Sequence, residues 1–561
     1  MSTLDTKDYI VFFIYFLIVA IYGIWVYRQK RSLSADSKDY FLAEGSLTWW
    51  AIGASLIASN ISAEQFIGMS GSGFTLGLAI ASYEWMSAAT LIIVAIFFIP
   101  VYLKNKIYTM PQFLSQRYNE SVAMIMAVFW LFLYIVVNLL SILYLGALAI
   151  SGISGLNVVA CIVLLAVFAI IITLGGMKVI GYTDVIQVFF LILGGLAATY
   201  LALNLVAEKS GQTGVLNGFS ILTRDASDHF NMIFTKEDKY YMDLPGWSVL
   251  IGGMWIANLN YWGCNQYITQ RALGADLNTA RNGLLFAAFL KILMPIIVVL
   301  PGIAAYMLHQ KGMFQTEMLT STGVVDVNKA YPSLLNLLPT GLKGLSFAAL
   351  TAAIVASLAG KANSIATIFT LDIYKKRINP EASEKRLVSL GKLSIIVSMF
   401  LAVGLSLLVG EKLMGEGKQG FQYIQEYTGF FSPGIFAMFL LGFFWKKATS
   451  NAAMFATLGG FFFSIFLKFL PTFADLSFLA SSGFSKQNAE GVYEIPFLDR
   501  MGIVFLLCVL GMYIISKVET ARGVKTKGLE IDSKMFRTTP SFTIGALVVV
   551  AIITVLYAIY W

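Results

Sequence analysis

The sequence is poor in the side chains that carry out covalent, redox or metal chemistry. Its 561 residues include three cysteines and two histidines. The cysteines, Cys161, Cys264 and Cys508, all fall in apolar stretches, so they do not form the disulfide framework of a small extracellular domain. His229 and His309 fall in separate polar stretches. The sequence therefore gives no support for zinc chemistry or histidine-based catalysis, and we do not expect an enzyme.

Charged residues are also scarce. Asp, Glu, Lys and Arg make up 12% of the sequence and hydrophobic residues make up 58%, with a mean hydropathy of +0.76. These values exclude an ordinary soluble globular protein. The net charge is +8, but the basic residues are dispersed among short polar stretches and form no single stripe. The sequence therefore does not indicate nucleic-acid binding.

Apolar runs of roughly 20 residues recur along the whole chain, and each is long enough to cross a hydrocarbon core about 30 Å thick. We therefore predict an all-α membrane protein with about 14 transmembrane helices in a single membrane domain, residues 1–561. The expected spans are 9–27, 48–72, 77–103, 122–152, 157–175, 179–207, 247–268, 283–308, 341–371, 388–409, 421–445, 449–470, 500–516 and 542–561.

The first apolar run resembles a signal peptide in length only. Asp5 and Asp8 precede it and no small-residue cleavage site follows, so we expect a retained span. With the N-terminus outside, alternate loops from 28–46 to 517–537 become cytoplasmic, and these loops hold most of the 39 basic residues, as the positive-inside rule requires. We therefore predict a multi-pass protein of the cell (inner) membrane with both termini outside.

A polar block interrupts the second apolar run. Residues 59–65 read Ser-Asn-Ile-Ser-Ala-Glu-Gln, and Gly68, Gly71 and Gly73 follow. A charge at a helix centre in a membrane costs roughly 2.5–3.5 kcal/mol, and irregular backbone at that depth occurs only where it is buried in protein or lines a water-filled cavity. The seventh run is broken as well, by Gly252-Gly253 and then by Asn258, Asn260, Gly263 and Asn265, with Asn258–Trp262 as the matching polar break. Two broken helices at corresponding positions indicate a transporter with inverted repeats and a binding site between them.

This pattern predicts how the chain is divided. The expected parts are an extra N-terminal helix at 9–27, a first five-helix repeat at 48–207, a second five-helix repeat at 247–445 and C-terminal helices at 449–561.

Two opposite charges fall near the middle of predicted spans, Glu84 in the third and Lys291 in the eighth. Such charges pair with each other or line a pathway, and a structural ion pair between two helices is the simpler hypothesis. Other polar and aromatic side chains at similar depth favour a binding site: Gln65, Ser87, Asn258, Gln425, Tyr261 and Trp262. Together they suit a neutral polyhydroxy ligand, whose hydroxyls donate and accept hydrogen bonds while its C–H face stacks on an aromatic ring.

Several segments closely resemble the sodium/solute symporter family. They are residues 54–73, 81–87 and 421–429, together with 175–177 before 182–184, which resembles the signature of that family. The resemblance covers nearly the whole chain. It implies a LeuT-type fold of five plus five helices in inverted repeats. It also implies import of a neutral hexose, galactose or glucose, by alternating access and coupled to sodium.

The resemblance also implies roles for individual residues. The expected sugar contacts are Gln65, Glu84, Ser87, Asn258, Lys291 and Gln425, with Tyr261 stacking on the pyranose as the inner gate. The expected outer gate is Met69, Tyr83 and Phe421, and Trp262 is expected beneath Tyr261. The expected ligands of the sodium ion are backbone oxygens of Ala58, Ile61 and Ala353 and the hydroxyl of Ser357, with Asp184 near the ion's exit path.

The ninth predicted helix departs from the family pattern. Where close relatives have two adjacent serines, this chain has Ala356-Ser357, and Lys361 follows one helical turn later on the same face. In one hypothesis Lys361 pairs with Asp184 or reaches the cytoplasmic vestibule, and sodium binds with water in place of the missing hydroxyl. In the other, Lys361 places a fixed positive charge near the sodium position and makes transport sodium-independent or proton-linked.

Two other classes of protein remain as alternatives. A membrane sugar sensor would bind its ligand without net transport. A membrane-embedded enzyme would need a catalytic dyad or a metal cluster, and the sequence contains neither. The expected partners are therefore a small sugar, a sodium ion and the lipid bilayer.

Overall fold

The computed structural model describes residues 4–29, 47–320, 323–414, 419–488 and 491–561. These residues are predominantly helical, as the hydropathy predicts. Two short strands, β1 (Lys486–Gln487) and β2 (Tyr493–Glu494), form an antiparallel pair in which Lys486 lies opposite Glu494. Of the expected cytoplasmic loop 28–46, residues 30–46 lie outside the described residues.

Helices lie at every expected span, and further short helices lie between some of the spans. In the first half of the chain they are α1 (Thr6–Gln29), α3 (Trp49–Asn60), η1 (Glu64–Met69), α4 (Ser70–Leu76), η2 (Gly77–Ala81), α5 (Ser82–Ile93), η3 (Val94–Phe98), α6 (Ile99–Lys104), α7 (Met110–Arg117), α8 (Glu120–Phe132), η4 (Leu133–Leu139), α9 (Leu140–Ser154), α10 (Val158–Thr173), α11 (Met177–Glu208), α12 (Val215–Asp225) and η5 (Ser227–Phe230).

In the second half they are α13 (Trp247–Ile251), α14 (Gly253–Cys264), α15 (Gln266–Leu273), α16 (Leu277–Gln310), η6 (Val327–Lys329), α17 (Ala330–Leu335), α18 (Leu342–Thr367), η7 (Ile368–Ile378), α19 (Glu384–Met414), α20 (Gly420–Gly429), α21 (Ser432–Phe444), α22 (Ser450–Met454), η8 (Phe455–Gly459), α23 (Gly460–Phe469), η9 (Leu470–Thr472), η10 (Ser477–Leu479), α24 (Phe497–Ala521), η11 (Ser533–Phe536) and α25 (Pro540–Ile559).

The number of membrane crossings is less definite than the positions of the helices. Among the described residues, 10 helices are long and apolar enough to cross a membrane, or 11 if the pair α20 and α21, bent by 50°, is one span. The range 64–104 forms one continuous helical stretch, and α10 is shorter than a typical span. The expected total of about 14 crossings and the division into repeats 48–207 and 247–445 therefore stay predictions.

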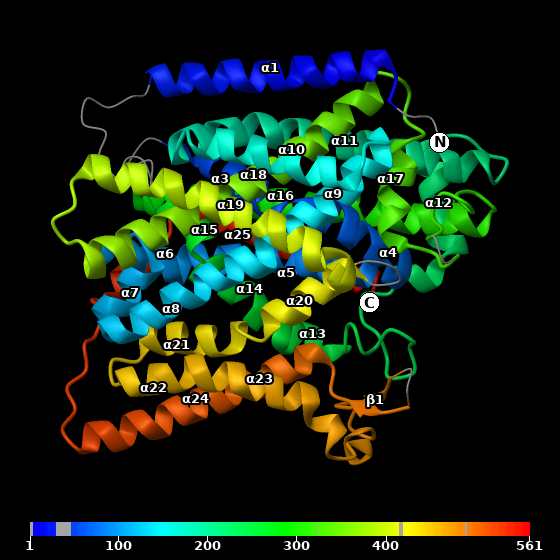
Figure 1. Ribbon diagram of the computed structural model, residues 1–561. Helices are drawn as coiled ribbons and strands as arrows, with labels where there is room; N and C mark the ends of the chain where they lie inside the picture. The colour runs from blue at the N-terminus through cyan, green and yellow to red at the C-terminus, as the bar shows by residue number, and fades with distance from the viewer. Residues whose placement is uncertain (1–3, 30–46, 321–322, 415–418, 489–490) are drawn as a thin grey trace.

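The helices pack side by side in a broad bundle (Figure 1). In that view α1 lies along one edge and α24 along the opposite edge, while α3, α16 and α18 lie between them. Helix α16 packs against α3, α4 and α5, and α18 packs against α3 and α11. The first helix begins and the last helix ends at the same end of the bundle, as an even number of crossings would require.

A buried arginine lies within residues 104–121, which fall between two of the expected spans. Residues 110–117 form α7, and the Arg117 side chain is 1% exposed. Its guanidinium donates to the carbonyl oxygens of Gly442, Trp445 and Ala448, at 2.8, 2.8 and 3.1 Å. The last carbonyls of a helix have no partner within it. Arg117 therefore caps the end of α21 and joins the two halves of the chain.

The polar block breaks the second span, as predicted. Helix α3 ends at Asn60, Ile61 has an extended backbone with φ −78° and ψ 116°, and helical structure resumes at Glu64. The Gln65 side chain accepts from the backbone N–H and the hydroxyl of Ser62, at 3.0 and 3.3 Å. The side chain thus satisfies a backbone donor that the break leaves without a helical partner.

The seventh span is also interrupted, and the interruptions fall at Gly252 and at Asn265, two of the residues expected to break it. The stretch between them that was expected as the matching polar break, Asn258–Trp262, is instead continuous helix within α14. The physical reason is that the Asn258 amide donates to the carbonyl of Met254 one turn earlier, at 3.1 Å, so the polar side chain is satisfied by the helix that carries it.

Candidate functional site

A polar cavity lies where the break of the second span meets α5, α14 and α20. Its empty volume is about 740 Å³, open solvent at its mouth included. All the expected sugar contacts except Lys291 line it, namely Gln65, Glu84, Ser87, Asn258, Gln425 and Tyr261. Three of the expected gate residues, Tyr83, Phe421 and Trp262, line it too. The structure thus brings together residues from four separate parts of the sequence.

Lys291 lies behind the wall of this cavity. Its ammonium contacts Glu84 Oε2 at 2.5 Å and also donates to the Asn60 side-chain oxygen. Lys291 and Glu84 are 1% and 3% exposed at their side chains, and the ammonium lies 5.3 Å from the centre of the Trp262 ring. Lys291 therefore acts on the cavity through Glu84 and Asn60.

Asn60 is a site residue that the sequence prediction missed. It lines the cavity, and its amide nitrogen donates to the Tyr261 hydroxyl at 2.9 Å. A continuous chain of polar contacts therefore runs from Glu84 through Lys291 and Asn60 to Tyr261. The signal was present in the sequence, because Asn60 is the last helical residue before the break, where the cavity wall has to form.

Ser87 and Asn258 join α5 to α14 across the cavity. The Ser87 hydroxyl lies 2.6 Å from Asn258 Oδ1 and 2.7 Å from the Tyr83 carbonyl. A hydroxyl has one proton and can donate to one of these oxygens at a time. The other oxygen is then available to accept a hydrogen bond from a ligand, so this pair can adjust to a hydroxyl group in the cavity.

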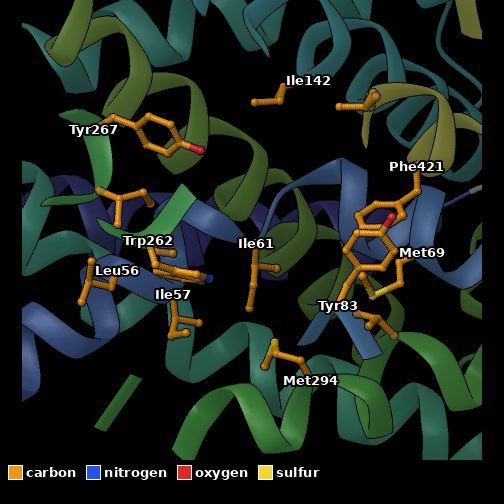
Figure 2. Close-up of a cluster of buried hydrophobic side chains, with 14 of the residues drawn as sticks. Leu56, Ile57, Ile61, Met69, Tyr83, Ile142, Trp262, Tyr267, Met294 and Phe421 are labelled. Atoms are coloured by element: carbon orange, nitrogen blue, oxygen red, sulfur yellow. The ribbon is translucent and has the colours of Figure 1, made fainter. Parts of the chain in front are cut away.

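Figure 2 shows how the expected gate residues are arranged. Met69, Tyr83 and Phe421 meet in one cluster, Trp262 lies at the other side of the view, and Ile61 lies between them. The Tyr83 and Phe421 rings are 5.1 Å apart at 88°, an edge-to-face contact. Their roles as gates stay predictions.

Gly68 is required where the outer cluster packs on the broken span. A Cβ added at Gly68 would lie 3.0 Å from both the backbone nitrogen and the Cβ of Phe421. These contacts are tighter than most Cβ contacts, and one of them is to backbone. The absence of a side chain at Gly68 therefore lets α20 approach η1 closely enough to place Phe421 over the cavity.

Tyr267 is a second residue that the sequence prediction missed. Its ring packs edge-to-face on Tyr261 at 5.7 Å, and the Lys361 ammonium lies 4.7 Å from the Tyr267 ring centre. Tyr261 also packs on Trp262 at 5.1 Å. Tyr261 and Tyr267 therefore link the cavity directly to the predicted ion region.

The predicted ion region lies where α18 packs on the end of α3. The Ser357 hydroxyl donates to the Ser59 carbonyl at 3.1 Å, and the Lys361 ammonium donates to the Ser357 hydroxyl at 2.9 Å. Ala58, Ile61 and Ala353, whose carbonyls are expected to bind sodium, are each no more than 1% exposed. The two segments expected to hold sodium thus do meet, and an ammonium lies at the point where they meet.

The hypothesis that Lys361 pairs with Asp184 or reaches a vestibule is wrong for this structure. Lys361 is 1% exposed, and its ammonium donates to the Ser357 hydroxyl. Asp184 instead accepts from the Ser55 hydroxyl at 2.6 Å, and the Arg271 Nε donates to that same hydroxyl at 2.8 Å. Arg271 was expected in a cytoplasmic loop, but it is 1% exposed and occupies the place beside Asp184.

The residues at this position do not fit a bound sodium ion. Ala356 offers no hydroxyl, and the hydroxyl of Ser357 already accepts from an ammonium. A hard cation held by Ser357 at roughly 2.4 Å could lie no more than about 5 Å from the Lys361 nitrogen. At an effective dielectric constant of about 20, two unit positive charges at that separation repel by about 3 kcal/mol.

A broken helix and a polar cavity within a bundle of apolar helices define a membrane transporter. The structure shares its fold with a Na⁺-coupled sialic acid symporter whose substrate-bound, outward-open structure is known. The two superpose with a TM-score of 0.74 over 92% of this chain and 98% of that chain, at 22% sequence identity.

Sequence comparisons identify the family. The model of the sodium:solute symporter family matches residues 40–460. The sodium/glucose cotransporter of Vibrio parahaemolyticus is 46% identical over 561 residues, covering 99% of this chain and 98% of that protein. The sodium/myo-inositol cotransporter 2 of Oryctolagus cuniculus is 34% identical over 475 residues, covering 80% and 68%.

The chain therefore belongs to the sodium:solute symporter family. Its members are transporters rather than enzymes. The predicted family and the prediction that the protein is not an enzyme are therefore confirmed, and the protein is a multi-pass membrane protein.

Proposed function

We propose that this protein carries a neutral hexose, galactose or glucose, across the membrane by alternating access. The observation that carries the proposal is the polar wall formed by Glu84, Asn60 and Tyr261, with the buried Lys291 neutralising Glu84 from behind. The wall offers a carboxylate and an amide beside a phenolic ring, which suits a ligand that is uncharged and rich in hydroxyls. The similarity to a sodium/glucose cotransporter over the full chain supports the same substrate class.

The proposed roles follow from position. Gln65, Glu84, Ser87, Asn258 and Gln425 bind the hydroxyls of the sugar, because these side chains line the cavity from different helices. A site built from such groups rejects analogues that lack a bonded hydroxyl, because its buried polar groups would be left unpaired.

Alternating access needs a barrier on each side of the sugar. Met69, Tyr83 and Phe421 close the outer side, and Tyr261 stacks on the sugar with Trp262 beneath it on the inner side. Trp262 lies apart from Met69, Tyr83 and Phe421 in Figure 2, which supports one gate on each side. The two proposed five-helix repeats, 48–207 and 247–445, rock around this site.

Family membership favours sodium as the coupled ion, since the relatives described above are sodium cotransporters. A second candidate, sugar transport without sodium, is favoured by a specific observation: the Lys361 ammonium on the Ser357 hydroxyl. A proton-linked carrier and a non-transporting sugar sensor are two further alternatives.

Counterflow of labelled galactose and glucose in proteoliposomes tests the proposal. We expect rapid exchange for the wild-type protein and severe loss for Gln65→Ala, Glu84→Ala and Asn258→Ala, without loss of expression. Asn217→Ala, an exposed amide on α12, is the matched control and should exchange normally. Near-normal counterflow in all three cavity variants would contradict this site, and sugar binding without counterflow would identify a sensor.

A further inference from the structure

The charges around Lys361 are balanced within the protein. The charged groups that act most strongly on Lys361 are Glu64 and Arg271, and Arg271 in turn acts on Asp184. Glu64 faces the cavity and accepts from the Ser141 hydroxyl at 2.9 Å. This region therefore holds two carboxylates and two cations, namely Glu64, Asp184, Lys361 and Arg271. An added monovalent cation would leave an uncompensated positive charge in a buried place, where such charges are costly.

The Lys361 ammonium also makes the contacts expected of a cation that joins the two helices. It binds the Ser357 hydroxyl at 2.9 Å, and this hydroxyl donates to the Ser59 carbonyl at the end of α3 at 3.1 Å. It lies 4.7 Å from the centre of the Tyr267 ring, and a buried cation over an aromatic face is attracted by the ring. A single nitrogen thus contacts α18 and α15 and acts on α3 through one hydroxyl.

The same nitrogen is linked to the sugar cavity. Tyr267 packs on Tyr261 at 5.7 Å, and Tyr261 lines the cavity and accepts from Asn60. Asn60 is the last residue of α3 before the break. A change at the Lys361 nitrogen therefore reaches the inner wall of the sugar site through two aromatic rings and reaches the break through Ser357.

We propose that Lys361 supplies the cation of this site from the protein itself, and that sugar binding consequently needs no sodium. The ammonium holds α18 against the end of α3 and supports the inner aromatic wall, whether or not sodium is present. Ala356 fits this arrangement because a second hydroxyl ligand is not needed. The inference rests on the proposed function only in that a hexose is the ligand, and it concerns the ion requirement of that function.

Sodium binding tests the inference without any sugar. The apparent melting temperature of the detergent-purified protein is measured in sodium chloride and in choline chloride at equal ionic strength, since a ligand that binds only the folded state stabilises it. We expect no sodium-specific stabilisation of the wild-type protein. Lys361→Met should acquire it, with a rise in sodium affinity of roughly 100-fold, and Ala356→Ser in the same background should strengthen it further.

Lys343→Met is the matched control. It removes a buried lysine at the start of the same helix, about 27 Å away along the helix axis, and should leave the sodium response unchanged. Wild-type stabilisation by sodium equal to that of Lys361→Met would overturn the inference.

Sugar binding supplies the second readout, and it needs only the wild-type protein if Lys361→Met does not fold. Galactose and glucose affinities in sodium and in choline should agree within about twofold. A sodium-induced gain of tenfold or more would overturn the inference and leave sugar transport intact. If neither sugar binds in either salt, the proposed function fails, while the sodium-dependent melting comparison still decides the role of Lys361.

Discussion

Replacing one member of the Glu84–Lys291 pair should lower the stability of the protein far more than replacing both members. The two side chains are 3% and 1% exposed and their charged atoms are 2.5 Å apart. At an effective dielectric constant of about 20, attraction at that distance amounts to roughly 7 kcal/mol, and much of it offsets the cost of taking both charges out of water. Lys291→Met leaves the Glu84 carboxylate buried without a cation and also deprives Asn60 of a donor.

The expected magnitudes follow from that imbalance. Each of Lys291→Met and Glu84→Gln should destabilise the protein, the former by about 3–5 kcal/mol. The double variant Glu84→Gln/Lys291→Met should lie within about 2 kcal/mol of the wild type, because no uncompensated charge remains. The measurement is a double-mutant cycle on the stability of the detergent-purified protein.

The ion pair Lys375–Glu384 provides the control cycle. Its side chains are 39% and 46% exposed at 3.2 Å, so the same substitutions should couple by no more than about 1 kcal/mol. Strictly additive effects of Glu84→Gln and Lys291→Met would refute the reasoning, because they would mean that the two charges do not neutralise each other. Counterflow adds a further distinction: variants at Glu84, which lines the cavity, should lose sugar exchange even where stability is restored.

Two further predictions concern Asp243 and Gly68. Burial, followed by repulsion from Glu426, raises the pKa of Asp243 to about 6. The folded state therefore holds the proton of the Asp243 carboxyl more tightly than the unfolded chain does, so the stability of the protein should fall as the pH rises from about 4 to about 6. Melting temperatures measured over a series of pH values should show this fall for the wild-type protein, and Asp243→Asn should remove it. Gly68→Ala should reduce sugar exchange several-fold, because the new methyl group would meet Phe421 at 3.0 Å. Gly502→Ala should not reduce sugar exchange, because a Cβ added there meets open space. Equal effects of the two substitutions would exclude close packing against Phe421 as the cause.

The membrane class and the helix positions could be predicted because both depend on local composition. An apolar run long enough to cross a bilayer has few alternatives to a helix, since backbone groups in lipid must be satisfied within the segment. The break after Asn60 could also be predicted, because Ser59–Gln65 places a carboxylate and amides at membrane depth. In the seventh span Gly252 and Asn265 do interrupt the helix, but the polar run Asn258–Trp262 between them stays helical, because the Asn258 amide is satisfied by Met254 and by Ser87.

The candidate site was only partly visible in the sequence. Glu84 and Lys291 stood out as charges in apolar surroundings, but Asn60, Tyr267 and Arg271 did not. Asn60 meets Lys291 across 231 positions of the chain, and Arg271 meets Ser55 across 216 positions. No local pattern records such meetings, which depend on how helices pack.

The sequence by itself determined that this chain is a helical membrane transporter of the sodium:solute symporter family, with a broken second span and polar groups suited to a sugar. It also placed Ser357 and Lys361 on one face of the ninth predicted helix, with Ala356 beside them. The tertiary structure decided where the Lys361 charge lies: on Ser357, beside Tyr267, with Arg271 rather than Lys361 next to Asp184. A long flexible side chain can reach several partners from one backbone position, and only the packing of the surrounding helices selects among them.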